Sequence, residues 1–153
     1  MKRTNRARFA ALVVAILRMP GSGSALADDQ LTKPDPDDPK LVARGKIVYA
    51  EQCASCHGAS LEGQPNWRHR LPNGRVPAPP HDPTGHTWHH SDKQLFEMTK
   101  LGPGALVPGY ESDMPGFKDK LSDADIWAVL SYIESTWPPA IRDKQKRMNA
   151  GRQ

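Results

Sequence analysis

The sequence is poor in cysteine and has no long apolar run. Only two of its 153 residues are cysteines, Cys53 and Cys56, which excludes a framework of several disulfides and a zinc site built from four cysteines. The run at residues 9–17 has nine apolar residues, whereas a membrane-spanning helix needs about 20. No stretch alternates between apolar and polar residues with the period of a β-strand, so the pattern favours an all-α fold.

The first 27 residues have the pattern of a secretory signal. A basic start precedes the apolar run, and Ala25-Leu26-Ala27 is a cleavage site with small residues at its first and third positions. We therefore expect signal cleavage after Ala27, a mature chain that begins at Asp28, and a periplasmic location. The alternative is that the segment stays uncleaved and acts as a short membrane anchor.

Without this leader the charge of the chain is nearly balanced. The whole chain has a net charge of +4, but five of its 21 basic residues and none of its 17 acidic residues lie in the leader. The mature chain therefore has a net charge of −1, which gives no case for nucleic-acid binding. Residues 28–38 are predicted to be an acidic flexible lead-in, and residues 138–153 a basic, solvated C-terminal tail.

Three segments of the chain carry helix patterns. Apolar residues recur at helical spacing over residues 39–52. Ser91 is a candidate N-cap for a helix over residues 92–101, and Ser122 is a candidate N-cap for a last helix over residues 123–136. Between these helices we expect long ordered loops, at residues 58–90 and 102–120.

The segment Cys53-Ala54-Ser55-Cys56-His57 is the C-x-x-C-H signature of covalent haem attachment. Thiols three positions apart lie one helical turn apart, so that each can add to one haem vinyl group, and the next residue can bind the iron. Export supports this interpretation, because haem is attached in the secreted compartment. The alternatives are a redox dithiol or a structural disulfide, but a thioredoxin-like motif should follow a strand, and none is visible.

The chain resembles the class I c-type cytochromes. Gly45, Tyr49 and the C-x-x-C-H motif match the G-x-x-x-aromatic-x-x-x-C-x-x-C-H helix of that family, and Val129 and Tyr132 match paired positions on its last helix. The resemblance covers residues 39–137. It implies a cytochrome c fold with three main helices around one covalent haem, and a close crossing of the first and last helices at Gly45.

The resemblance also implies that Met114 binds the iron opposite His57. Met114 precedes a proline in a loop shortly before the last helix, where the family carries its axial methionine. Met98 falls in a predicted helix and Met148 in the basic tail, so neither is well placed. A soft thioether ligand favours Fe(II) and raises the reduction potential. The alternative is a methionine that only fills the core.

Histidines offer a competing sixth ligand, since five of them lie between His57 and Met114: His69, His81, His86, His89 and His90. A second metal, copper or zinc, bound by His86, His89 and His90 is another alternative. A loop histidine more commonly bonds to a carbonyl or a haem propionate. Arg68 and Arg70 are candidate partners for propionates in the same way.

These features together predict a periplasmic single-electron carrier and not an enzyme. Because His57 and Met114 would fill both axial positions, no open site remains for substrate chemistry. The expected partners are redox proteins: a membrane oxidase, a bc-type complex, a periplasmic dehydrogenase or a copper oxidase. Two alternatives stay open. One is a haem enzyme or gas-binding sensor with a displaceable sixth ligand, and the other is a metal-handling protein that uses the histidine cluster.

Overall fold

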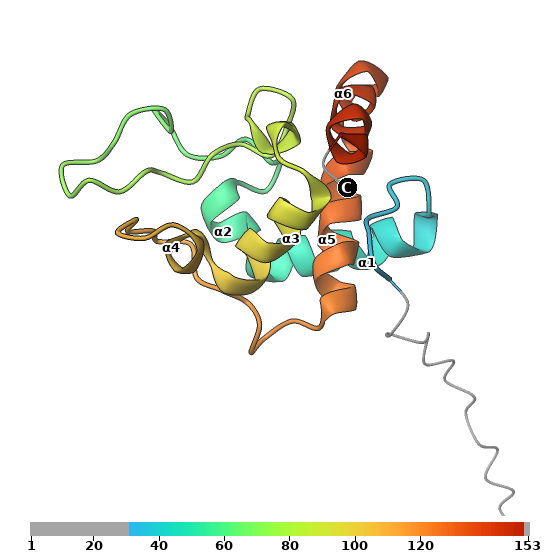
Figure 1. The fold of residues 1–153 in the computed structure, drawn as a ribbon, viewed down its shortest axis with the longest axis horizontal. Coiled ribbons are helices and arrows are strands. Elements are labelled where there is room, and N and C mark those ends of the chain that lie inside the picture. Colours follow the sequence, from blue (N-terminus) through green and yellow to red (C-terminus); the bar gives the residue numbers. More distant parts are fainter. Residues whose placement is uncertain (1–30, 152–153) are drawn as a thin grey trace, which may run out of the picture.

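The computed structural model describes residues 31–151, and the predicted leader lies outside this range. The described residues contain helices and loops but no strand, which confirms the all-α prediction. None of the helices in this range is long and apolar enough to cross a bilayer. Figure 1 shows the elements in chain order: α1 Pro39–Gln52, α2 Ala54–His57, η1 Thr87–His89, α3 Asp92–Leu101, α4 Pro103–Leu106, α5 Asp123–Ser135 and α6 Pro139–Ala150.

Side-chain caps fix where the three main helices begin. Asp38 accepts hydrogen bonds from the first turn of α1. Ser91 forms a capping box with Gln94 at the start of α3, and the Ser122 hydroxyl accepts from the backbone N–H of Asp125 at the start of α5. Each cap satisfies N–H groups that have no partner inside the helix. The predicted N-caps Ser91 and Ser122 are therefore confirmed.

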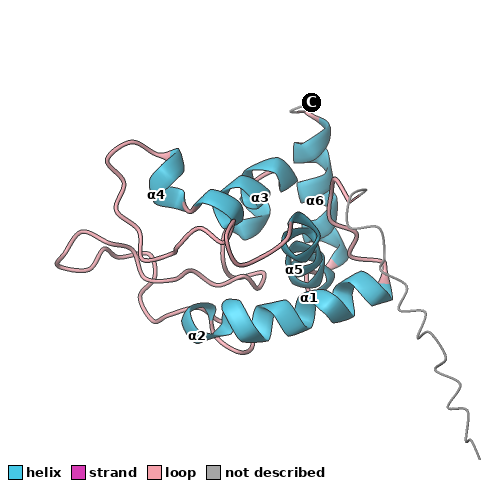
Figure 2. Cartoon of the chain, turned by 90° about the horizontal axis from the view of Figure 1, so that it is seen from below, coloured by secondary structure: helices cyan, strands magenta, loops and turns pink. Residues whose placement is uncertain are grey.

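The helices α1 and α5 cross in close contact. In Figure 2, α1 lies along its length while α5 is seen nearly end-on above it. A Cβ atom built on Gly45 would lie only 1.9 Å from the Ala128 carbonyl oxygen and 2.9 Å from Cβ of Tyr132. Gly45 therefore permits a backbone approach that any side chain at this position would block, as the resemblance implied.

Two apolar clusters meet on α5. One joins α1, the loop after α2 and the end of α5 through Val48, Tyr49, Leu61, Val129, Ile133 and Trp137. The other joins α3 to the start of α5 through Leu95, Ile126, Trp127 and Leu130. Burial of such side chains supplies the main favourable contribution to folding. The buried stripe of α5 thus links the first helix of the domain to its third.

The two charged ends differ from the solvated termini that we predicted. Leu31 packs against the second cluster, and the backbone N–H of Asp35 donates to the Ser131 hydroxyl at 2.9 Å. After Trp137 the chain forms α6, which packs against η1. The two segments also meet through charge, because the Arg142 guanidinium pairs with the Asp37 carboxylate at 2.7 Å.

Polar side chains attach α6 to the start of α3. Gln145 is only 2% exposed, and its amide donates to the His90 carbonyl at 3.2 Å and to the Asp92 carboxylate at 2.7 Å. Asn149 accepts from the backbone N–H of Asp92 at 2.9 Å. The side chains of Gln145 and Asn149 are neutral. The charges of residues 138–153 therefore predict a solvated tail and do not reveal the docked helix.

Glu134 on α5 is a buried acid, and we expect its replacement by glutamine to stabilise the protein. One carboxyl oxygen has no hydrogen-bond partner, and burial, reinforced by the charge of Asp92, raises the pKa of Glu134 to about 9. In unfolded chains a glutamate has a pKa of about 4.3. As pH rises from this value to about 9, the unfolded state loses a proton that the folded state keeps, so stability falls.

The Glu134→Gln variant removes this titration. Its gain in unfolding free energy should be small at pH 4, about 4 kcal/mol at pH 7, and larger still near pH 9. Urea unfolding at several pH values measures the gain. Glu97→Gln on the exposed face of α3 is the matched control and should show no such rise. A gain for Glu134→Gln that is the same at every pH would contradict the assignment.

Candidate functional site

The C-x-x-C-H motif forms a helical turn directly after α1. The backbone N–H groups of Cys56 and His57 both donate to the Cys53 carbonyl, at 3.1 and 2.9 Å. Cys53 is partly buried, Cys56 is exposed, and the two are not bridged. Burial, with a smaller contribution from the neighbouring Cys56, raises the pKa of the Cys53 thiol to about 11. The structure therefore presents two separate thiols on one turn, and it contains no structural disulfide between them.

His57 is buried and held through one of its two ring nitrogens. Its side chain lies with Nδ1 2.8 Å from the Pro79 carbonyl oxygen. Because a carbonyl can only accept, Nδ1 carries the hydrogen and Nε2 is left with the lone pair. Burial lowers the pKa of His57 despite this hydrogen bond, so the ring is neutral near pH 7. A neutral imidazole with a fixed tautomer is suited to bind a metal through Nε2.

The loop that follows the motif folds back to bring Pro79 to His57. The backbone N–H of Gly63 donates to the His57 carbonyl at 2.7 Å, and that of Gln64 donates to the Ala78 carbonyl at 2.8 Å. Gly63 has a positive φ of 68°, and a Cβ atom there would lie 2.4 Å from the backbone nitrogen of Pro80. Position 63 therefore needs glycine both for its backbone conformation and for the close approach of the backbone at Pro79 and Pro80.

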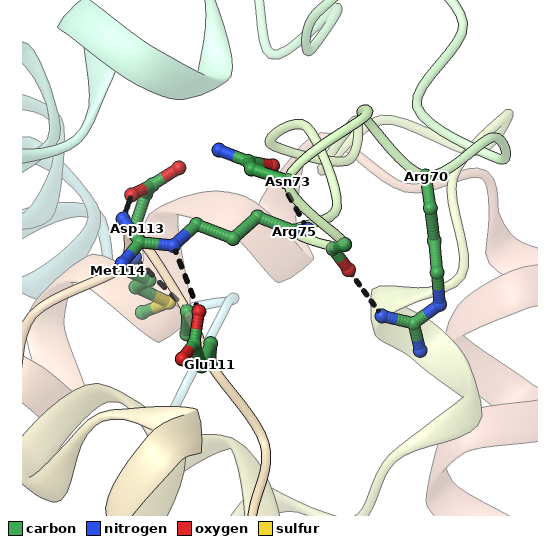
Figure 3. Close-up of polar contacts among 8 residues, drawn as sticks. Arg70, Asn73, Arg75, Glu111, Asp113 and Met114 are labelled. Atoms are coloured by element: carbon green, nitrogen blue, oxygen red, sulfur yellow. Dashed lines mark hydrogen bonds and ion pairs between the residues drawn. The ribbon is translucent and has the colours of Figure 1, made fainter.

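Met114 lies in a separate loop, between α4 and α5, and that loop is tied to the first one. Figure 3 shows Arg75 reaching from the earlier loop to Glu111 and Asp113, with Met114 beside them. The Arg75 guanidinium pairs with the Asp113 carboxylate, and its Nε lies 3.6 Å from the Glu111 carboxylate. The Met114 N–H donates to the Ser112 hydroxyl at 3.1 Å. Met114 itself is partly buried.

The structure thus gathers the predicted site residues in two groups. Cys53, Cys56 and His57 share one turn, and Met114 stands on the later loop. In Figure 2, α2 lies on one side of the molecule, whereas α3 and α4, which lead into the Met114 loop, lie on the other. After Met114 the chain is anchored to the end of α3, where the Phe117 N–H donates to the Thr99 carbonyl at 3.0 Å.

The loop histidines pair with aromatic rings and do not form a metal cluster. His86 stacks on Trp67 with ring centroids 5.3 Å apart, and His89 meets the Trp88 ring edge-on at 3.8 Å. The His90 ring lies 5.4 Å from that of His86. Within residues 31–151 no group of three or more histidine, cysteine or carboxylate side chains is arranged to hold a metal ion.

The two candidate arginines have contacts within the protein. The Arg68 guanidinium lies over the Trp67 ring at 4.5 Å and donates to the Thr84 carbonyl. Arg70 donates to the Gly74 carbonyl at 2.6 Å, and its guanidinium lies 5.8 Å from the ring centroid of Tyr110. Both arginines therefore help to fix the shape of the loop at residues 64–78.

Sequence reasoning missed the roles of two residues next to the motif. One is Pro79, whose carbonyl oxygen fixes the tautomer of His57. The other is His81, which the sequence offered only as a competing sixth ligand and which stacks face to face on His57 with ring centroids 4.0 Å apart. The only signal was the proline-rich segment that precedes His81, and prolines mark turns without showing which distant residue the turn will meet.

Comparison with known proteins identifies the family. A sequence model described as cytochrome c matches residues 42–137, more than half of the chain. The chain belongs to the cytochrome c family. This confirms the resemblance and the predicted fold, and it establishes haem-based electron transfer as the general function. No solved structure is matched.

Relatives of this cytochrome c chain include parts of larger proteins. It is 30% identical over 101 residues to the cbb3-type cytochrome c oxidase subunit CcoP of Rhodobacter capsulatus, which covers 65% of this chain and 31% of that protein. It is 33% identical over 103 residues to thiosulfate dehydrogenase of Stutzerimonas stutzeri, covering 67% and 29%. Cytochrome c-555 of Prosthecochloris aestuarii is 33% identical over 78 residues, covering 47% and 78%. The chain thus spans about a third of the first two relatives.

The residues of the motif turn fit the covalent haem c of this family. Two unbridged thiols lie on one turn, and the neighbouring imidazole has its Nδ1 engaged and its Nε2 lone pair available. Haem c proteins use two such thiols for covalent attachment and an adjacent imidazole as an iron ligand. The carbonyl hydrogen bond on the far nitrogen is the kind of outer contact that fixes a metal-binding histidine. Nothing in this arrangement conflicts with a haem at this position.

Proposed function

We propose that this chain is a single-electron carrier with one haem c, attached through Cys53 and Cys56 and bound at the iron by His57 and Met114. Haem c supplies a one-electron Fe(III)/Fe(II) couple when bound. The protein's own part is to hold the two ligands, to exclude water from them, and so to set the reduction potential. One C-x-x-C-H motif in a sequence with two cysteines supports one haem.

The observation that carries the proposal is the His57–Pro79 hydrogen bond. It holds a buried, neutral imidazole with Nε2 as its free lone pair, directly after two unbridged thiols. A redox dithiol of the thioredoxin type has no use for such a histidine, and the described residues provide no strand to precede one. The motif and its outer contact are therefore better explained by a haem ligand than by dithiol chemistry.

The proposed location and partners follow from the sequence and the relatives. The pattern of residues 1–27 supports export to the periplasm with cleavage after Ala27. We propose residues 39–137 as the cytochrome domain, to which α6 is docked. Similarity to an oxidase subunit supports a membrane oxidase as partner, and a bc-type complex, a periplasmic dehydrogenase or a copper oxidase would use the same one-electron exchange.

A haem enzyme is the second candidate, because one relative is a thiosulfate dehydrogenase. An enzyme of this kind needs an iron position that substrate can reach, whereas a carrier keeps both axial positions filled. Met114 is the residue on which the two functions differ. Carbon monoxide binding by the reduced protein at neutral pH separates them, since a carrier with an intact methionine–iron bond should bind it poorly.

Met114→Ala is expected to remove the weak charge-transfer band that a methionine–iron bond gives near the red end of the ferric spectrum. It should also open the reduced protein to carbon monoxide and lower the reduction potential, because a thioether stabilises Fe(II) more than water or imidazole does. Absorption spectra with and without carbon monoxide, together with a redox titration, measure all three effects.

Two kinds of control make this test decisive. Met148→Ala, on α6, changes the same residue type away from the motif and should keep the band, the potential and the resistance to carbon monoxide. If iron is instead bound by His86, His89 or His90, Met114→Ala will leave the spectrum unchanged and one of the three His→Ala variants will carry the effect. That outcome would overturn the Met114 assignment while leaving the covalent haem in place.

A further inference from the structure

His81 is a buried histidine that the electron-carrier function does not yet explain. It lies two residues after Pro79, and its ring stacks on His57 with a centroid distance of 4.0 Å and an interplanar angle of 26°. Two ligands on opposite sides of an iron point their nitrogens at each other along one line. A ring stacked face to face on His57 has a different geometry, so His81 is excluded as the sixth ligand in this arrangement.

Four contacts fix the position of His81. Its backbone N–H donates to the Leu61 carbonyl at 2.8 Å, and its carbonyl accepts from the indole N–H of Trp137 at 2.8 Å. The ring nitrogen Nδ1 lies 2.8 Å from the Thr87 hydroxyl, and the ring edge faces Tyr49 with centroids 6.3 Å apart. The ring is therefore held by Thr87 and Tyr49, while the backbone of His81 is anchored to Leu61 and Trp137.

The Thr87 hydroxyl links His81 back to the same proline segment. Thr87 is 5% exposed, and its hydroxyl lies 3.4 Å from the Pro80 carbonyl, to which it donates. The hydroxyl oxygen is then free to accept from Nδ1–H of His81. Thr87 thus anchors the stacked ring by a hydrogen bond that an apolar side chain of the same shape lacks.

His57 needs such a support because a single hydrogen bond does not fix a ring. The torsion about the Cβ–Cγ bond of histidine has broad minima, and the Pro79 carbonyl restrains the ring at Nδ1 only. A second ring packed against its face removes the remaining rocking motion. The orientation of the imidazole plane decides how its orbitals overlap with those of a bound metal. A restraint on the His57 ring therefore affects the electronic state of that metal as well as the stability of the fold.

We propose that His81 is a positioning residue that sets the plane of the His57 imidazole and, with it, the electronic state of the iron that His57 binds. The proposal rests on the proposed role of His57 as an iron ligand. Thr87 acts through His81 by holding its ring against His57. Neither residue contacts a reacting group in this scheme, so both act on the iron indirectly.

The test uses the holoprotein in its ferric form and two readouts, the principal g values by electron paramagnetic resonance and the reduction potential. We expect His81→Ala and Thr87→Val to broaden or split the low-spin signal and to shift the potential. Thr87→Ser keeps the hydroxyl and should retain the wild-type signal. His69→Ala, on an exposed loop histidine, should also change neither readout.

A purely structural role predicts a different result. If His81 only fills space, the variants will lower the thermal unfolding midpoint but leave the g values and potential of the folded protein unchanged, and the proposal is then wrong. Thr87→Val keeps the test usable if His81→Ala fails to fold, because it preserves the shape of the side chain. A wild-type protein without methionine–histidine ligation would contradict the Met114 assignment separately, before any His81 variant is compared.

Discussion

A variant that carries both Cys53→Ala and Cys56→Ala is expected to lose all of its haem to acid–acetone extraction, whereas the unchanged protein should keep its colour. Each thiol in the proposed site forms one thioether bond to the haem, and no other cysteine exists in the sequence to replace them. Extraction followed by an absorption spectrum of the protein fraction measures the effect, which should be complete.

Mass spectrometry of the denatured chain makes the same test quantitative. The unchanged protein should carry the mass of one haem, and each single variant should keep a covalent haem through its remaining thiol, in lower yield. Ser55→Ala, between the two cysteines, is the matched control and should be fully loaded. Extraction of haem from the unchanged protein would contradict covalent attachment, whatever the variants do.

Replacing Gly45 by alanine is expected to destabilise the fold by about 3 kcal/mol or more. Helix propensity alone predicts the opposite sign, because alanine is favoured over glycine by about 1 kcal/mol inside a helix. The added Cβ would, however, lie 1.9 Å from the Ala128 carbonyl oxygen. Backbone atoms of α5 cannot turn aside as a flexible side chain can, so the two helices must separate and the packing between them is lost.

Thermal or urea unfolding of the holoprotein measures this loss. Gly151→Ala makes the same chemical change at the end of α6, where the nearest atom would lie at an ordinary distance of 3.7 Å, and it should change stability little. An increase in stability for Gly45→Ala would show that helix propensity dominates and that the crossing is looser than the structure shows. Because the protein as a whole is held by only about 5–15 kcal/mol, the expected loss is large.

The main helices were predictable because their signals are local. Ser91 and Ser122 stand directly before amphipathic segments, and a hydroxyl at that position satisfies the first free N–H groups of a helix. The C-x-x-C-H motif was equally clear, since its chemistry depends on spacing within five residues. The crossing at Gly45 came from a family pattern, and the structure explains that pattern by the clash with Ala128.

Contacts between distant segments were not predictable from the sequence. The Pro79 carbonyl meets His57 across 22 positions, and nothing in the proline-rich loop marks which carbonyl will point inwards. The docking of α6 depends on Gln145, a residue type that usually faces solvent. Charge patterns describe the surface of such segments, whereas their attachment depends on individual neutral and charged groups whose partners lie elsewhere in the chain.

The hydrogen bonds between Gln64 and Ala78 bear on where the sequence of this protein can change in length during evolution. The backbone N–H of Gln64 donates to the Ala78 carbonyl at 2.8 Å, and its side chain accepts from the Ala78 N–H at 3.0 Å. Residues 65–77 therefore form a loop whose two ends are joined by these hydrogen bonds. The contact between Pro79 and His57 lies outside that loop. Insertions, deletions or a new recognition sequence in residues 65–77 could be accommodated without moving the Pro79 carbonyl that orients the His57 ring. This loop is the place where we expect close homologues to differ most in length.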